Sequence, residues 1–164
     1  MVPGSNLIGV YLEVGTKRTF AGALDWPGWC RNGRDETAAL KALMEYGPRY
    51  ARALRLVRLG FRAPKDTSEF AIRERLAGNA TTDFGAPDMP TAHDTDPIGD
   101  PALRRFRAVL KAGWRTFDSA VVAAKGKELR KGPRGGVRWT VRRFVRRVAW
   151  HVLDHAWEIE DRIL

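Results

Sequence analysis

The first part of the chain has a hydrophobic pattern typical of short β-strands followed by a helix. Residues 7–14 form an apolar run rich in β-formers, and residues 18–25 alternate weakly after a glycine-containing turn. Two such runs joined by a short turn predict a β-hairpin. Pro27-Gly28 ends the second strand, and Trp29 and Cys30 can begin a short third one.

A helix is predicted directly after these strands. Asp35 is a good N-cap, and the apolar positions that follow recur at helical spacing, at Ala39, Leu40, Leu43 and Tyr46. Gly47-Pro48 must kink or stop this helix. Apolar residues then alternate with charged ones from Phe70 to Leu76, which indicates another strand. Residues 1–80 are therefore expected to form one unit with the element order β-β-(β)-α-β.

The rest of the chain divides into a linker and a helical part. Residues 81–100 are rich in proline, glycine and aspartate, a composition typical of a linker. From residue 101 onward the apolar positions have helical spacing, which predicts long helices over 103–124 and 137–162. The predicted fold class is α+β, with a small β-β-(β)-α-β unit followed by a two-helix hairpin in residues 101–164.

The last predicted helix is apolar on two sides. One broad face carries His151 and His155 at its margin and consists of Val141, Phe144, Val145, Val148, Val152, Ala156, Ile159 and Ile163. Nearly opposite lie three tryptophans among four arginines: Trp139, Trp150, Trp157, Arg142, Arg143, Arg146 and Arg147. A helix of this kind needs cover on both sides. We expect this surface to meet the N-terminal unit, a second copy of the chain or a nucleic acid.

The net charge of +10 is concentrated in one segment. Residues 1–100 hold 13 basic and 13 acidic residues, whereas residues 101–150 hold 15 basic and two acidic ones. Such a segment can attract phosphates or acidic surfaces, although arginine-rich helical faces are also often only solvated. The basic surface predicted on the last helix consists of Arg138, Arg142, Arg143, Arg146 and Arg147.

The composition favours a cytoplasmic protein. No apolar run approaches the roughly 20 residues that span a bilayer, so we expect no membrane partner. The N-terminus lacks the basic and apolar regions of a secretion signal. The single cysteine, Cys30, excludes an internal disulfide framework, and we expect it to be a small buried hydrophobe.

A candidate metal site lies in the last helix. His151 and His155 are separated by one helical turn, so both imidazoles can face one metal ion. The zincin pattern is absent, because Val152 stands where a zincin has its glutamate. Asp154 and Glu158 flank His155 and are candidates for the second shell. The alternative is that His155 packs near the core and hydrogen-bonds to one of these carboxylates.

Residues 10–54 resemble the HicB-like antitoxin fold. The resemblance is carried by the hairpin, the Asp25-Trp26-Pro27-Gly28-Trp29-Cys30 turn, Gly33, the acidic cap Asp35-Glu36 and the alanine-rich helix that follows. The chain departs from the pattern by inserting Trp29 before Cys30. The resemblance implies a small α/β module that binds a protein partner and has no catalytic residues.

Residues 146–157 resemble the late helix of DinB-like metal-binding four-helix bundles. In that family this helix carries two histidines at the spacing of His151 and His155, and an earlier helix supplies a third histidine. The resemblance implies that these two residues bind zinc or nickel. Only residues 125–136 separate the two long predicted helices here, so the chain would hold half of such a bundle and no third histidine from it.

Three functions are therefore expected as alternatives, and no substrate or reaction follows from the sequence. The first is a metal-binding DinB-like protein, active or catalytically degenerate, whose ligand shell is completed by His93, Glu158, water or a second subunit. The second is a non-enzymatic, dimerising interaction module of HicB-like type. The third is nucleic-acid binding through the basic segment 104–147.

Overall fold

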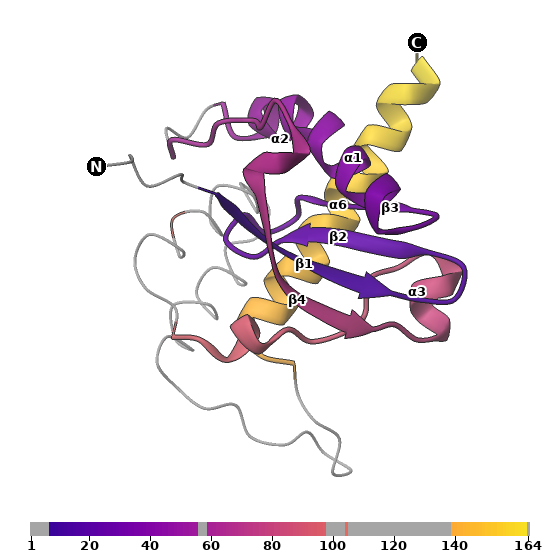
Figure 1. The fold of residues 1–164 in the computed structure, drawn as a ribbon. Helices are drawn as coiled ribbons and strands as arrows, with labels where there is room; N and C mark the ends of the chain where they lie inside the picture. Colours follow the sequence, from indigo (N-terminus) through magenta and orange to yellow (C-terminus); the bar gives the residue numbers. More distant parts are fainter. Residues whose placement is uncertain (1–6, 56–58, 98–103, 105–138, 164) are drawn as a thin grey trace.

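The computed structural model describes residues 7–55, 59–97, 104 and 139–163 (Figure 1). Its strands are β1 (Ile8–Val14), β2 (Thr19–Ala23), β3 (Cys30–Gly33) and β4 (Phe70–Ala77). Its helices are α1 (Glu36–Glu45), α2 (Gly47–Ala53), α3 (Ala80–Phe84) and α6 (Val141–Ile163). Two short 3-10 turns are η1 (Thr67–Glu69) and η2 (Ala92–Thr95). The predicted α+β class is confirmed. The expected helix over 103–124 lies almost wholly outside the described residues.

The four strands form one mixed sheet with the order β3-β2-β1-β4. The first three strands run antiparallel as a meander, with Leu12 opposite Ala21 in the β1–β2 hairpin. Strand β4 pairs in parallel with β1, and the register shifts between Val10 and Tyr11. A parallel partner needs a crossover, which α1 and α2 supply between β3 and β4. The element order of residues 8–77 is thus the predicted one, with the third strand present.

Local sequence signals set the bounds of α1 and α2. The Asp35 carboxylate caps α1 by accepting a hydrogen bond of 2.8 Å from the backbone N–H of Ala38. Helix α1 ends before Gly47, and Pro48 occupies the first turn of α2, where its missing N–H costs nothing. The chain therefore turns between the two helices at the position predicted from Gly47-Pro48.

Side chains alternate across β1 and build a core on each face of the sheet. Val10 and Leu12 point to the face covered by α1 and α2, where they pack with Trp29. Tyr11 points to the opposite face, where a second buried cluster contains Phe20, Cys30 and Trp150 of α6. The burial of Cys30 is as expected.

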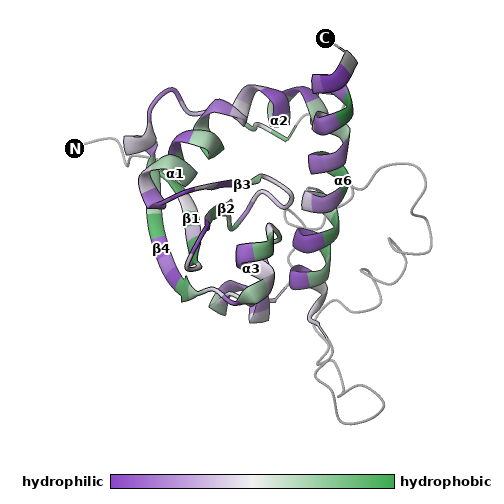
Figure 2. Cartoon of the chain, turned by 90° about the vertical axis from the view of Figure 1, so that its right-hand side faces the viewer, coloured by the Kyte–Doolittle hydropathy of each residue, from purple (hydrophilic) through white to green (hydrophobic). Residues whose placement is uncertain are grey.

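Helix α6 joins both cores, because it runs past the strands and reaches the level of α2 (Figure 2). Trp150 packs edge-on against Phe20, while Trp157 packs against Tyr46 beside α1. Helix α6 comes close to the backbone at Gly28, which has a φ of +89°. A Cβ there would lie 2.9 Å from the Cβ of Ala149, so glycine is required both by conformation and by space.

The two sides of α6 that were expected to need cover are buried to different extents. The structure buries the tryptophan side at Trp150 and Trp157, and it also buries Ala149 and, from the broad apolar face, Val145. Of the residues assigned to the apolar face, Val152 and Ile159 are exposed. The tryptophan side of α6 packs against the N-terminal unit, which was one of the three surfaces expected to meet this helix. In the part of the chain that is described, no helix is long and apolar enough to cross a membrane.

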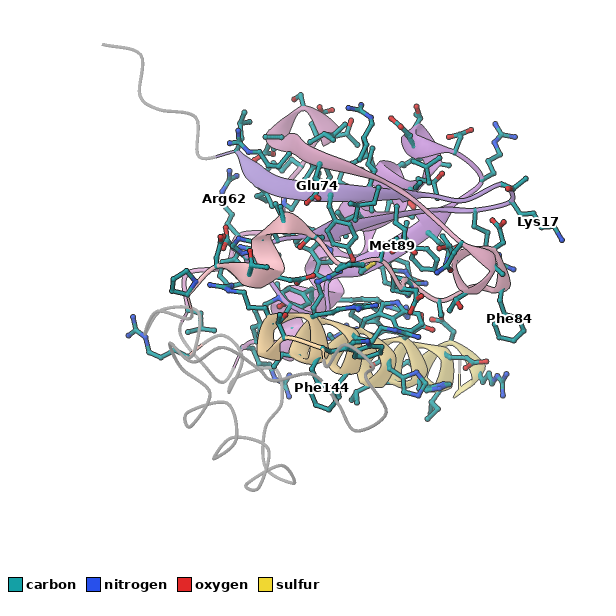
Figure 3. The ribbon with its side chains drawn as sticks, turned by 90° about the horizontal axis from the view of Figure 1, so that it is seen from below. Lys17, Arg62, Glu74, Phe84, Met89 and Phe144 are labelled. Carbon is teal, nitrogen blue, oxygen red and sulfur yellow. The ribbon has the colours of Figure 1, made fainter. Side chains whose placement is uncertain are left out.

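The segment expected as a linker packs onto the sheet over residues 80–97. The buried carboxylate of Glu13 holds it in place, accepting hydrogen bonds from the Thr82 hydroxyl at 2.5 Å and the backbone N–H groups of Asp88 and Met89 at 2.9 and 3.1 Å. Figure 3 shows Met89 between the sheet and α6. This segment therefore forms part of the layer on which α6 rests.

Candidate functional site

The two histidines of the predicted metal site lie side by side on the exposed side of α6. The ring centroids of His151 and His155 are 4.5 Å apart, with the ring planes nearly perpendicular. Both residues are exposed. The one-turn spacing thus brings the imidazoles together as expected, at a solvent-accessible position.

The two predicted second-shell carboxylates behave differently. Glu158 Oε2 lies 3.4 Å from His155 Nδ1, a position from which it can orient the ring and leave Nε2 for a ligand. Asp154 instead accepts a hydrogen bond of 2.6 Å from Arg31 of β3. The geometry therefore supports the predicted role of Glu158, whereas Asp154 anchors α6 to the sheet edge.

The third histidine, His93, is held elsewhere. Its Nδ1 lies 2.5 Å from Asp96, and its Nε2 lies 3.5 Å from Asp25 and 3.2 Å from Arg142 at the start of α6. The hydrogen bond with Asp25 raises the pKa of His93, with a further contribution from Asp96, against the opposing effects of burial and Arg142. Across the described ranges, no three His, Cys, Asp or Glu side chains are grouped to hold a metal ion. Within these ranges, α6 therefore offers two adjacent candidate ligands, which by themselves do not make a metal site.

Exposed apolar side chains surround the histidine pair. We define the outer face of α6 as its exposed residues Phe144, His151, Val152, His155, Ala156 and Ile159. Val152 is 43% exposed and Ile159 is 60% exposed. Figure 3 shows Phe144 on the side of α6 that is turned away from the sheet. Apolar groups gathered in this way on a helix are typical of an interaction site.

The arginines predicted as a basic surface mostly point inward. Arg142 is buried and donates hydrogen bonds of 2.9 Å to the carbonyls of Asp96 and Pro97. Arg146 pairs with the buried Asp94 at 2.6 Å and lies over the Tyr11 ring.

The two other described arginines of this set each lie over a tryptophan ring. Arg143 donates to the Asp88 carbonyl at 2.5 Å and lies over Trp139, and Arg147 lies over Trp150. Arg138 is outside the described residues. Arg142, Arg143 and Arg146 thus serve mainly to dock α6 on segment 80–97.

The acidic partners of these arginines were not predicted from the sequence. Asp88, Asp94 and Asp96 lie in the segment that was expected to be a linker. A signal was present, since this aspartate-rich segment and the arginine-rich start of α6 carry opposite charges. Complementary charge in two segments favours their contact, but it does not by itself distinguish docking within one chain from binding to another molecule.

The interior contacts around Cys30 leave little room for chemistry. Burial raises the pKa of the Cys30 thiol to about 12, with Tyr11 Oη 3.6 Å from the sulfur. The cavity beside it has a volume of about 10 Å³, enough for about one water molecule. A buried thiol held in the neutral form is a poor nucleophile, so Cys30 contributes packing.

No protein-family model, curated protein or solved structure was found to match this chain. The geometry of α6 and its surroundings is therefore the basis on which a function is inferred.

Proposed function

We propose that this protein is a cytoplasmic, non-enzymatic interaction module that associates with a second copy of itself through the outer face of α6. The observation that carries the proposal is the exposure of Val152 and Ile159 on a helix whose opposite side is already buried. Removing apolar surface from water is favourable by about 25 cal/mol per Å². A helix packed on one side can bury the other side only against another surface.

A second copy fits this face because the face is complementary to itself in an antiparallel arrangement. A two-fold axis near residue 153 would place Ile159 of one copy near Phe144 of the other. On one edge of the outer face lie Arg147 and Glu158, which are unlike charges at similar distances on either side of that axis. The antiparallel pair brings each Arg147 next to the opposite Glu158, whereas a two-fold parallel pair would place these edges on opposite sides of the contact and form no such pairs.

The HicB-like resemblance adds a protein partner to this proposal. The meander β1-β2-β3, the Pro27-Gly28 turn and the capped helix α1 support such a module. Strands β3 and β4 are at the sheet edges and offer backbone groups for pairing with another chain. The alternatives have less support among the described residues, because Arg142 and Arg146 of the basic segment are engaged within the chain and the DinB-like metal pair lacks a third ligand there.

The proposal is tested by sedimentation velocity on the full chain in the presence of a chelator, over about 1 to 100 μM, the range of moderate protein affinities. We expect a reversible dimer. Val152→Asp and Ile159→Asp should each weaken dimerisation at least about tenfold, since each would place a charge in an apolar contact. Circular dichroism checks that the variants remain folded.

Phe84→Asp is the matched control. Phe84 is 87% exposed but belongs to α3 and not to the outer face of α6. It should leave dimerisation unchanged. A wild-type chain that stays monomeric at about 100 μM, with Ile159→Asp lowering its stability instead, would mean that the chain covers the outer face with its own residues, and the proposal would fail.

A further inference from the structure

We infer that His151 and His155 of two copies together form a four-histidine zinc site on the two-fold axis of the α6 pair. The inference depends on the proposed dimer. The nitrogen ligands of such a site would come in equal number from each chain. Neither chain alone holds the site.

Each chain supplies half of a tetrahedral shell. The His151 and His155 rings are close enough for one nitrogen of each to reach a common metal ion at the usual distance of about 2.0–2.1 Å. Two ligands bind zinc weakly, because structural zinc sites have four protein ligands. Glu158 lies close to His155, but no three His, Cys, Asp or Glu side chains of the described residues are grouped to hold a metal ion, so further ligands must come from outside them.

The symmetry of the α6 pair supplies these ligands. The two histidines are four residues, about 6 Å, apart along the helix axis, and the axis proposed for the dimer passes between them. An antiparallel copy then places its His155 opposite His151 and its His151 opposite His155. All four imidazoles lie on the same edge of the contact, since both histidines lie on one side of Val152 and Ile159 around the helix.

Contacts around the pair suit a metal at this position. Glu158 lies 3.4 Å from His155 Nδ1, so this nitrogen can donate to the carboxylate while Nε2 faces the metal. The exposed apolar neighbours Val152 and Ile159 would exclude water from one side of the site once the dimer forms. Soft-to-borderline nitrogen ligands in a tetrahedral set favour zinc over magnesium or calcium.

The inference is tested with zinc alone on untagged, chelator-treated full chain. Titration calorimetry should give one zinc ion per two chains, and sedimentation should show at least about tenfold tighter dimerisation with zinc than with chelator. By linkage, zinc affinity must also rise with protein concentration. Cobalt(II) in place of zinc should give the intense visible absorption of a four-coordinate ion.

Variants separate the metal site from the apolar contact. His151→Ala and His155→Ala should abolish zinc binding and the zinc-dependent tightening, while the chelator-resistant dimer remains. The control is His93→Gln, because His93 is bound to Asp25 and Asp96 near the start of α6 and should not affect zinc binding.

Two results would overturn the inference, and a third would overturn only the proposed function. One zinc ion per chain without a change in dimerisation would place the site within a single chain. No zinc binding by a chain that dimerises in chelator would remove the metal site and leave the proposed function intact. A chain that is monomeric in chelator but forms a zinc-bridged dimer lost in His155→Ala would retain the metal site and refute the apolar contact as the cause of association.

Discussion

The carboxylate of Glu13 lies fully buried at the end of β1 and holds segment 80–97 through three donors. Its oxygens accept from the Thr82 hydroxyl and the backbone N–H groups of Asp88 and Met89. When a buried donor loses its acceptor, the protein loses more stability than the hydrogen bond had contributed, because the donor cannot bond to water instead. Glu13 therefore connects the sheet to the layer under α6.

Glu13→Ala should lower the free energy of unfolding by about 2–4 kcal/mol, because it leaves several buried donors without an acceptor. Urea denaturation measures the change. Glu74→Ala is the matched control: Glu74 also accepts from a backbone N–H of this segment, that of Ala92, but it is only half-buried and should cost less than about 1 kcal/mol. Equal losses in the two variants would contradict this role of Glu13.

His93 lies between Asp25, Asp96 and Arg142, and its protonated form is favoured. Since the folded-state pKa of His93 is raised above 6.5, mainly by Asp25, the folded state binds this proton more tightly than the unfolded state does. This stabilisation is complete below the unfolded pKa and is lost as pH rises through the folded one.

The wild-type chain should therefore lose stability relative to His93→Gln, which has no titrating group at this position, as the pH rises above about 6.5. Thermal unfolding of both proteins as a function of pH measures the difference. If the difference in stability between the two proteins does not change with pH, then Arg142 keeps His93 neutral. The distance of 3.2 Å between Arg142 Nη1 and His93 Nε2 would also allow that state.

Helix α6 has a charge distribution that opposes its own dipole. Arginines fill its first turns and acidic residues its last ones, whereas the macrodipole favours the reverse. The contacts of the helix compensate for this. Near its C-terminal end Glu160 and Asp161 receive hydrogen bonds from Arg52 and Arg49 of α2. The order of charges along α6 thus sets the direction in which the helix lies on the domain.

The sequence was sufficient for those elements whose signals are local. Asp35 and Gly47-Pro48 determine the bounds of α1 and α2 through capping and the missing proline N–H, both of which act within one turn. The adjacency of His151 and His155 follows from helical spacing alone. The packing of segment 80–97 did not follow, because its anchor, Glu13, is almost 70 residues away from Thr82 in the chain.

The buried side of α6 was also beyond local prediction. Hydropathy scales count arginine as polar, whereas the long stems of Arg142 and Arg146 pack inward and their charged ends find carbonyls and Asp94. Trp150 and Trp157 belong to the same side. Which side of a two-sided helix is buried depends on the surface it meets, and that surface is formed by residues far away in sequence.

At the scale of the whole molecule, α6 and the N-terminal unit share their cores. Trp157 lies within the cluster that contains Val10, Leu43 and Tyr50, and Arg31 of β3 bonds to Asp154 of α6. A helix that contributes to the core of the sheet is expected to unfold together with it.

Trp157→Ala should lower the free energy of unfolding by about 3–5 kcal/mol and leave a single transition, since it opens a cavity in the shared core. Far-UV circular dichroism and tryptophan fluorescence, followed in urea, should coincide. Trp139→Ala is the control, because Trp139 is 38% exposed and should cost less than about 1 kcal/mol. Two separate transitions in the wild type would show that α6 folds independently.

The position of Trp150 against Phe20 and Cys30 has a consequence for synthesis of the chain. One face of a sheet built from residues 8–33 is closed by a helix made more than a hundred residues later. At the usual elongation rate of about 5–20 residues per second, that face stays open on the ribosome for several seconds or longer. Nascent chains of this protein should therefore expose this apolar face to chaperones until residues 142–157 emerge.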